Sequence, residues 1–200
     1  DAPSTINLIL PEAELGTEKE AEHTALINRT MEQYVAEGVF ETYADSFVYV
    51  ERTLENGTIR KGLIGKLDLD AYDYNVGSTS AVRATEKTVV ERIPPRQRVR
   101  RNAPIELPHI MVLIDDPDKN IIEPLHEATS KMSMVYKTTL MERGGQIAGY
   151  LLDKEQTEDV LTKMAALADP ERFAKYYNAE GYPVLTFAMG DGNHSLATAK

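Results

Sequence analysis

The chain has 200 residues, of which 42% are hydrophobic and 27% are charged, a balance typical of a globular domain with a core of ordinary size. Cysteine is absent, which excludes disulfide bonds, thiolate zinc sites and cysteine nucleophiles, and which suits a cytoplasmic protein. The net charge of −10 argues against a dedicated DNA-binding domain, and no apolar run reaches the roughly 18 residues that cross a bilayer.

The first strong structural pattern is a helix, predicted over about residues 18–37. Thr17 and Glu20 form a capping-box pattern at its start. Apolar residues then recur at helical spacing, and Gly38 stands where a helix commonly ends.

A β-hairpin is predicted next. Residues 46–53 alternate like a strand, and Asn56-Gly57 is a strong signal for a tight turn. Residues 58–69 then return as the second strand, and a further short strand is expected over residues 81–85.

The segment from Thr85 to Asn102 is predicted to contain two short helices. Pro94 and Pro95 forbid one continuous helix, so a break is expected at Ile93. This segment also carries a basic cluster of five arginines: Arg92, Arg96, Arg98, Arg100 and Arg101. Such a cluster either binds a small phosphorylated ligand or pairs locally with glutamates on a solvated helix face.

An apolar run, His109–Ile114, is consistent with a buried strand, and an acidic turn follows it. Asp115, Asp116 and Asp118 in that turn have two interpretations. Adjacent carboxylates at a strand end can hold Mg²⁺, whereas a polar turn that closes the strand is the commoner form.

The C-terminal half mixes strands and helices without strict alternation, which predicts an α+β fold: a mixed sheet with flanking helices in one domain over residues 1–200. Its predicted elements are strands over residues 132–141 and 147–152, a turn at Gly144-Gly145, a helix over residues 153–168 and a short helix over residues 170–177.

The last eighteen residues predict a strand over Val184–Met189, a tight turn over Gly190–Asn193 and the start of a helix. Glycines let the backbone approach a ligand closely, and the first N–H groups of a helix favour an anion such as phosphate. The alternative is a plain strand-to-helix connection in which Asn193 or Ser195 caps the helix.

Two side chains in this turn could carry chemistry. His194 could donate to a phosphate oxygen or act as an acid or base near neutral pH, or form a structural hydrogen bond. Asp191 could orient His194 or hold a metal ion, or bond its own backbone.

The strings GDGNHSLATAK, RATEKT, RIPPR and LPHIMVLIDDP resemble the signatures of an uncharacterised bacterial and archaeal family once labelled SpoOJ/ParA/ParB/RepB-like. Members of that family are about twice as long. The resemblance therefore implies that this chain is an internal fragment, and its start without a methionine agrees with that expectation.

The terminal turn also resembles the DGHTR-type turn of the free-serine kinases in the ParB/sulfiredoxin superfamily. That resemblance implies a ParB/sulfiredoxin-like core and ATP or ADP with Mg²⁺ as cofactors. It further implies a phosphotransferase acting on a small hydroxyl-bearing metabolite, with Glu86 as catalytic base beside His194 and Asp191. The nucleotide-binding residues implied are Gly190, Gly192, Asn193, Ser195, Arg83, Arg92 and Arg96.

Many family members have a DGHHR-type turn, from which this chain departs: Asn193 replaces the first histidine and Ser195 the arginine. Lys200 or the upstream arginines are candidates for the missing positive charge. The alternative function is a nucleotide- or phosphate-binding module without catalysis, like a ParB switch. Standard P-loop, dinucleotide and nucleophile-elbow motifs are absent from the sequence. If the phosphotransferase hypothesis holds, Glu86 or Arg83 must share one cleft with His194.

Overall fold

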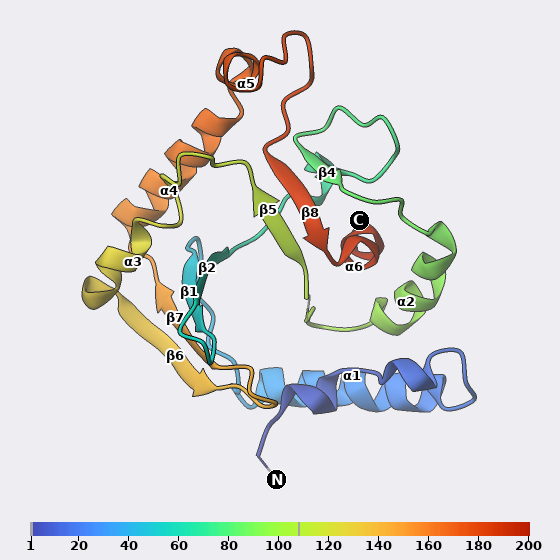
Figure 1. The fold of residues 1–200 in the computed structure, drawn as a ribbon. Coiled ribbons are helices and arrows are strands. Elements are labelled where there is room, and N and C mark those ends of the chain that lie inside the picture. Colours follow the sequence, from blue (N-terminus) through green and yellow to red (C-terminus); the bar gives the residue numbers. More distant parts are fainter. Residues whose placement is uncertain (1, 108) are drawn as a thin grey trace. The chain divides into compact units, whose positions relative to one another are not determined.

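The computed structural model describes residues 2–107 and 109–200, and its chain divides into two compact units (Figure 1). Unit 1 comprises Asp1–Thr42, Leu69–Leu113 and Phe187–Lys200, and unit 2 comprises Tyr43–Asp68 and Ile114–Thr186. Both units mix helices with a sheet, which confirms the predicted α+β class. The ParB/sulfiredoxin-like core and the single domain over residues 1–200 stay predictions.

Unit 2 is built on a four-stranded antiparallel sheet in the order β2-β1-β7-β6. Its elements are β1 (Val48–Thr53), β2 (Ile59–Ile64), α3 (Leu125–Ala128), the 3₁₀ helix η5 (Thr129–Lys131), β6 (Ser133–Thr139), β7 (Gln146–Leu151), α4 (Lys154–Leu167) and α5 (Pro170–Tyr177). Two predicted turns close its hairpins: Gly57 has φ +81° and Gly145 has φ +84°. Both values lie in the left-handed region that glycine tolerates best.

The core of unit 2 lies where α4 and the α3 region pack on the sheet. Tyr49 on β1 and Val160 on α4 are among its most deeply buried side chains. Helix α4 begins with a capping box, in which the Asp153 carboxylate accepts the Gln156 N–H and the Gln156 side chain accepts the Asp153 N–H. Burying the apolar face of α4 while capping its exposed N–H groups satisfies both the hydrophobic and the hydrogen-bonding demands of the helix.

Unit 1 contains the second sheet, in the order β3-β4-β8-β5. Its elements are the 3₁₀ helices η1 (Thr5–Leu8), η2 (Glu12–Glu14), η3 (Leu69–Ala71) and η4 (Val90–Arg92), the helices α1 (Glu20–Ala36), α2 (Ile93–Arg100) and α6 (Asn193–Ala199), and the strands β3 (Tyr72–Asp73), β4 (Val82–Ala84), β5 (Met111–Ile114) and β8 (Phe187–Asp191). The prolines occupy the first turn of α2, as predicted from their missing N–H groups.

Three expectations for unit 1 are corrected. The predicted capping box of Thr17 and Glu20 does not form, because α1 begins at Glu20 with Lys19 as its N-cap and without a side-chain cap. The run that ends at Ile114 is not a buried strand: Met111 and Leu113 are 56% and 54% exposed, because β5 lies at the edge of its sheet. The last strand is shifted relative to the predicted Val184–Met189. It includes Gly190 and Asp191, and Gly192 alone, with φ +87°, joins it to α6.

Candidate functional site

The site predicted from the terminal turn lies at one edge of the unit 1 sheet. Strand β4 pairs with β8 in parallel, with Val82 opposite Phe187 and Ala84 opposite Met189. Parallel neighbours end at the same edge of a sheet, which is where open α/β sheets commonly bind ligands. The segments that follow, residues 85–89 and 190–195, therefore emerge together.

Two hydrogen bonds join these segments. The Thr85 hydroxyl donates to the Met189 carbonyl, and the Val89 N–H donates to Nε2 of His194 over 3.0 Å. Residues separated by about a hundred positions are thus adjacent, while the shared cleft of Glu86 or Arg83 with His194 stays a prediction.

His194 has a structural role in this arrangement. Because its Nε2 accepts the Val89 N–H, the neutral imidazole carries its proton on Nδ1. Nδ1–H remains available as a donor, but Nε2 is not free to take a proton from a substrate. The ring is half-buried.

The Asp191 side chain accepts a hydrogen bond from the backbone of the next residue and does not orient His194. Its Oδ1 accepts the Gly192 N–H over 2.8 Å, and its side chain is exposed. That contact withdraws one backbone donor from the turn. The second carboxylate oxygen remains exposed at the sheet edge.

The two glycines of the turn lie in tight surroundings. A Cβ on Gly192 would lie 3.1 Å from the His109 carbonyl oxygen, and one on Gly190 would lie 3.2 Å from Leu113 Cγ, so a side chain at either position would need its neighbours to shift by a few tenths of an ångström. Gly192 also has φ +87°, in the left-handed region that favours glycine. These constraints favour glycine at both positions without any ligand.

The start of α6 retains backbone donors. Its first helical hydrogen bond joins the Leu196 N–H to the Gly192 carbonyl over 3.0 Å, so the N–H groups of residues 193–195 lie outside the helical ladder. Asn193 is only 3% exposed, and its amide nitrogen has no hydrogen-bond partner among residues 2–107 and 109–200. Its side chain therefore faces the interior and cannot reach a ligand on the surface.

The predicted cations do not all converge on the turn. Arg83 lies on β4, opposite Ala188, and Arg92 is exposed at the start of α2. Arg96 instead turns away, donating to the Arg92 carbonyl and, over 3.4 Å, to Glu12. Lys200, a proposed substitute for the missing charge, donates to the Tyr72 carbonyl.

Glu86 is exposed and follows β4 directly, so it lies on the segment that contacts His194. On the neighbouring strand β3, Tyr72 lies opposite Val82 and is fully buried, and burial raises the pKa of its phenol. On the same strand, the pKa of Asp73 is lowered because its carboxylate accepts the Asn75 N–H.

Sequence reasoning missed Arg100, the residue that joins the basic helix to the turn. Its guanidinium donates to the Ser195 carbonyl over 2.8 Å and also binds both carboxylate oxygens of Glu106. The predicted basic cluster includes Arg100, but the sequence does not show which of its five arginines contacts the turn. Helix periodicity could not show it either, because the partner is about a hundred residues away.

A resident metal centre is not apparent: no group of three or more potential ligands occurs in the described part of the chain. The aspartates of the acidic turn are used structurally within unit 2. Asp116 accepts the Ile121 N–H, and Asp115 accepts the Tyr177 hydroxyl. The latter bond raises the pKa of Tyr177 to about 12.

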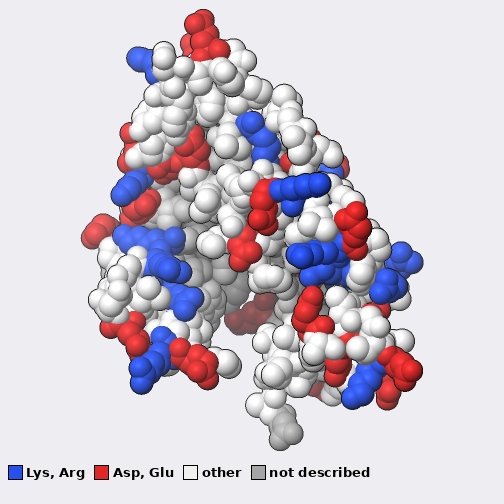
Figure 2. All heavy atoms as spheres, turned by 45° about the vertical axis from the view of Figure 1, so that its right-hand side comes forward, with Lys and Arg blue, Asp and Glu red and all other residues white. Residues whose placement is uncertain are grey.

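Side chains of both signs of charge appear on the face shown in Figure 2. None of the described helices has the length and hydropathy needed to cross a bilayer.

No curated protein and no solved structure matches the chain. One family model does match, and it covers residues 1–200. The chain therefore belongs to the family described as Protein of unknown function (DUF1015).

Proposed function

We propose that unit 1 binds a nucleotide through its phosphates at the shared edge of β4 and β8, and transfers the terminal phosphoryl group to a small hydroxyl-bearing metabolite. The observation that carries this proposal is the parallel pairing of β4 with β8, after which the Val89 N–H donates a hydrogen bond to His194. It supports the proposal because it brings the segments after β4 and β8 together at the edge where open α/β sheets bind ligands.

The donors available at this edge suit an anion. They are the three backbone N–H groups at the start of α6 and the Nδ1–H of His194. Asp191 contributes an exposed carboxylate oxygen. Mg²⁺ binds through one or two carboxylates together with phosphate oxygens, so Asp191 is the residue that would hold it. When bound, the ion would neutralise part of the negative charge on the phosphates.

Glu86 is the proposed general base. Its exposed carboxylate would accept the proton of the substrate hydroxyl as the hydroxyl oxygen bonds to the terminal phosphorus and the nucleoside diphosphate leaves. His194 would position the 85–89 segment and donate through Nδ1. It would not act as a base, because Nε2 is engaged.

The second candidate is nucleotide or phosphate binding without transfer. It is favoured by the engagement of His194 Nε2, which removes a possible base, and by the burial of Asn193, which removes a side chain that a kinase turn would direct at phosphate. The two candidates share the binding step and differ in turnover.

Thermal unfolding with ATP, ADP or inorganic phosphate, each with and without Mg²⁺, tests the binding step. Saturating ligand should raise the melting temperature, since a ligand at 100 times its Kd adds about 2.7 kcal/mol. Nucleoside diphosphate release in the presence of a panel of hydroxyl metabolites then tests transfer. Glu86→Gln should retain binding and lose turnover, whereas Glu91→Gln, at an exposed glutamate outside this edge, should retain both.

Binding without turnover in the wild-type chain would select the second candidate. If no phosphorylated ligand shifts the melting temperature, both candidates fail.

A further inference from the structure

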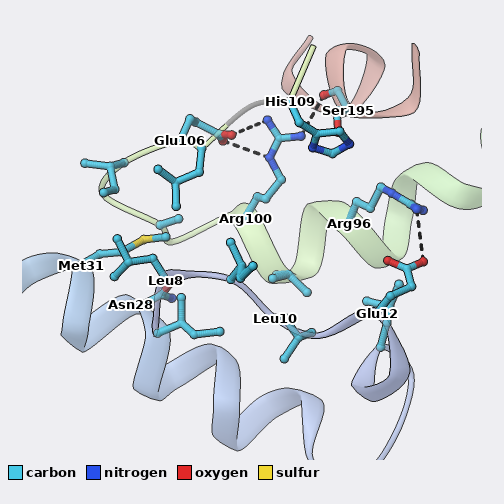
Figure 3. A pocket seen from close by; sticks show the side chains of 17 residues that line it. Leu8, Leu10, Glu12, Asn28, Met31, Arg96, Arg100, Glu106, His109 and Ser195 are labelled. Carbon is cyan, nitrogen blue, oxygen red and sulfur yellow. Dashed lines mark hydrogen bonds and ion pairs between the residues drawn. The ribbon is translucent and has the colours of Figure 1, made fainter. Parts of the chain in front are cut away.

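Unit 1 contains a cavity of about 310 Å³, whose lining includes Ser195 near the start of α6 (Figure 3). Its walls come from the N-terminal 3₁₀ helices, α1, α2 and the chain after α2. The apolar side chains among its described lining residues are all aliphatic, and they include Leu8, Ile27, Met31, Val99, Ala103 and Ile105. Small-molecule sites typically have about 300–1,000 Å³ and a mostly apolar lining, so this cavity falls at the small end of that range.

One polar side chain within the cavity lacks a partner. Asn28 lies on α1 one turn before Met31, and both side chains line the cavity. Its Oδ1 is buried and accepts no hydrogen bond from any residue in the described ranges. A buried acceptor without a donor is costly, so this amide suits a ligand that brings a hydroxyl or N–H group.

The rim of the cavity offers one arginine with a weak partner. Arg100 is saturated, because Glu106 and the Ser195 carbonyl occupy its guanidinium. One guanidinium nitrogen of Arg96 donates to the Arg92 carbonyl, and the other forms an ion pair of 3.4 Å with Glu12, whose side chain is 80% exposed. Figure 3 shows this pair apart from the Arg100 cluster. A ligand carboxylate could replace the exposed Glu12 at little cost, since surface ion pairs contribute about 0–1 kcal/mol.

We propose that this cavity binds a medium-chain aliphatic carboxylate that carries a hydroxyl on its chain. The chain lies among the aliphatic walls, the carboxylate pairs with Arg96, and the hydroxyl donates to Asn28 Oδ1. The apolar walls carry no aromatic side chain, and the one ring in the described lining is the imidazole of His109, so the walls suit an aliphatic chain. The proposal does not require phosphate binding at the β4–β8 edge, although Ser195 belongs to both sites.

Isothermal titration calorimetry with octanoate, its neutral analogue octanol and the isomeric hydroxyoctanoates tests the proposal. Arg96→Gln should weaken octanoate binding by about tenfold or more, as expected for a hydrogen bond between charged groups, and should leave octanol unchanged. The matched control is Arg101→Gln, at an exposed arginine that ends α2 and does not line the cavity; it should change neither affinity.

Two further variants test the chain and the hydroxyl. Val99→Phe fills the cavity and should abolish binding of octanoate and octanol alike. Asn28→Leu should remove the preference for the best hydroxyoctanoate over octanoate. The proposal is overturned if the wild-type chain does not bind octanoate, if Arg96→Gln binds it as tightly as wild type, or if no hydroxyoctanoate binds better than octanoate. If Val99→Phe does not fold, the two arginine variants, which lie on the surface, still decide the question.

Discussion

At the residue scale, His194 shows how one hydrogen bond restricts the chemistry of a side chain. Its position beside a glycine turn suggested acid–base catalysis, but the Val89 N–H occupies Nε2. The neutral ring can then donate through Nδ1 and cannot accept through Nε2. The same bond fixes the path of the 85–89 segment that carries Glu86. A residue that resembles a catalytic base thus holds another candidate in place.

We predict that His194→Ala lowers stability by about 1 kcal/mol, the usual contribution of a hydrogen bond, because the Val89 N–H loses its acceptor. His194→Gln should recover part of this loss, since its side-chain oxygen can accept the same N–H. Chemical denaturation measures stability, and amide exchange at Val89 reports the bond directly. Equal exchange at Val89 in wild type and His194→Ala would show that the bond is absent in solution.

At the element scale, a tight turn decides how two strands meet in unit 2. Gly145, with φ +84°, lies between β6 and β7, and a Cβ there would be 2.0 Å from the Thr53 carbonyl oxygen. Gly57, with φ +81°, lies between β1 and β2, and a Cβ there would meet nothing within 4 Å. The two glycines therefore share a backbone conformation and differ in the space around them.

Gly145→Val should be more destabilising than Gly57→Val. Both substitutions force a β-branched residue into the left-handed region, at a cost of about 1–2 kcal/mol. Only Gly145→Val also drives a side chain into the backbone of β1, which adds roughly 1–3 kcal/mol. Urea denaturation of the two variants provides the comparison. Binding at the β4–β8 edge should survive in folded Gly145→Val, and a variant of wild-type stability that had lost binding would contradict this explanation.

The individual helices and strands could be predicted from the sequence far better than the elements that each of them packs against or pairs with. The helix that became α1, the hairpin around Asn56-Gly57 and the proline start of α2 follow from local patterns, and the structure confirms them. The strand shift at Gly190 could not be predicted, because it depends on pairing with β4 and β5. The site shows the same division. Its residues were proposed from motifs, whereas the bonds from Val89 and Arg100 depend on long-range packing.

At the scale of the whole molecule, the chain passes alternately through the two units. Unit 1 is assembled from three segments and unit 2 from two. The last of these segments, Phe187–Lys200, supplies β8, an internal strand of the unit 1 sheet, together with α6. The candidate phosphate site therefore depends on a segment that follows the last residue of unit 2 in the sequence.

Deleting residues 187–200 should unfold the unit 1 sheet and leave unit 2 folded. Without β8, strand β4 loses one of its two neighbouring strands, and the edge strand β5 loses the strand with which it pairs. Unit 2 retains its whole antiparallel sheet and the core around Tyr49 and Val160, because all of its residues precede the deletion. Hydrogen exchange measured by mass spectrometry should show lost protection in β3, β4 and β5, and unchanged protection in β1 and β7. The full-length chain is the control. Loss of protection in β1 and β7 as well would show that the units fold as one cooperative body, and retained protection in β4 would show that β8 is dispensable to its sheet.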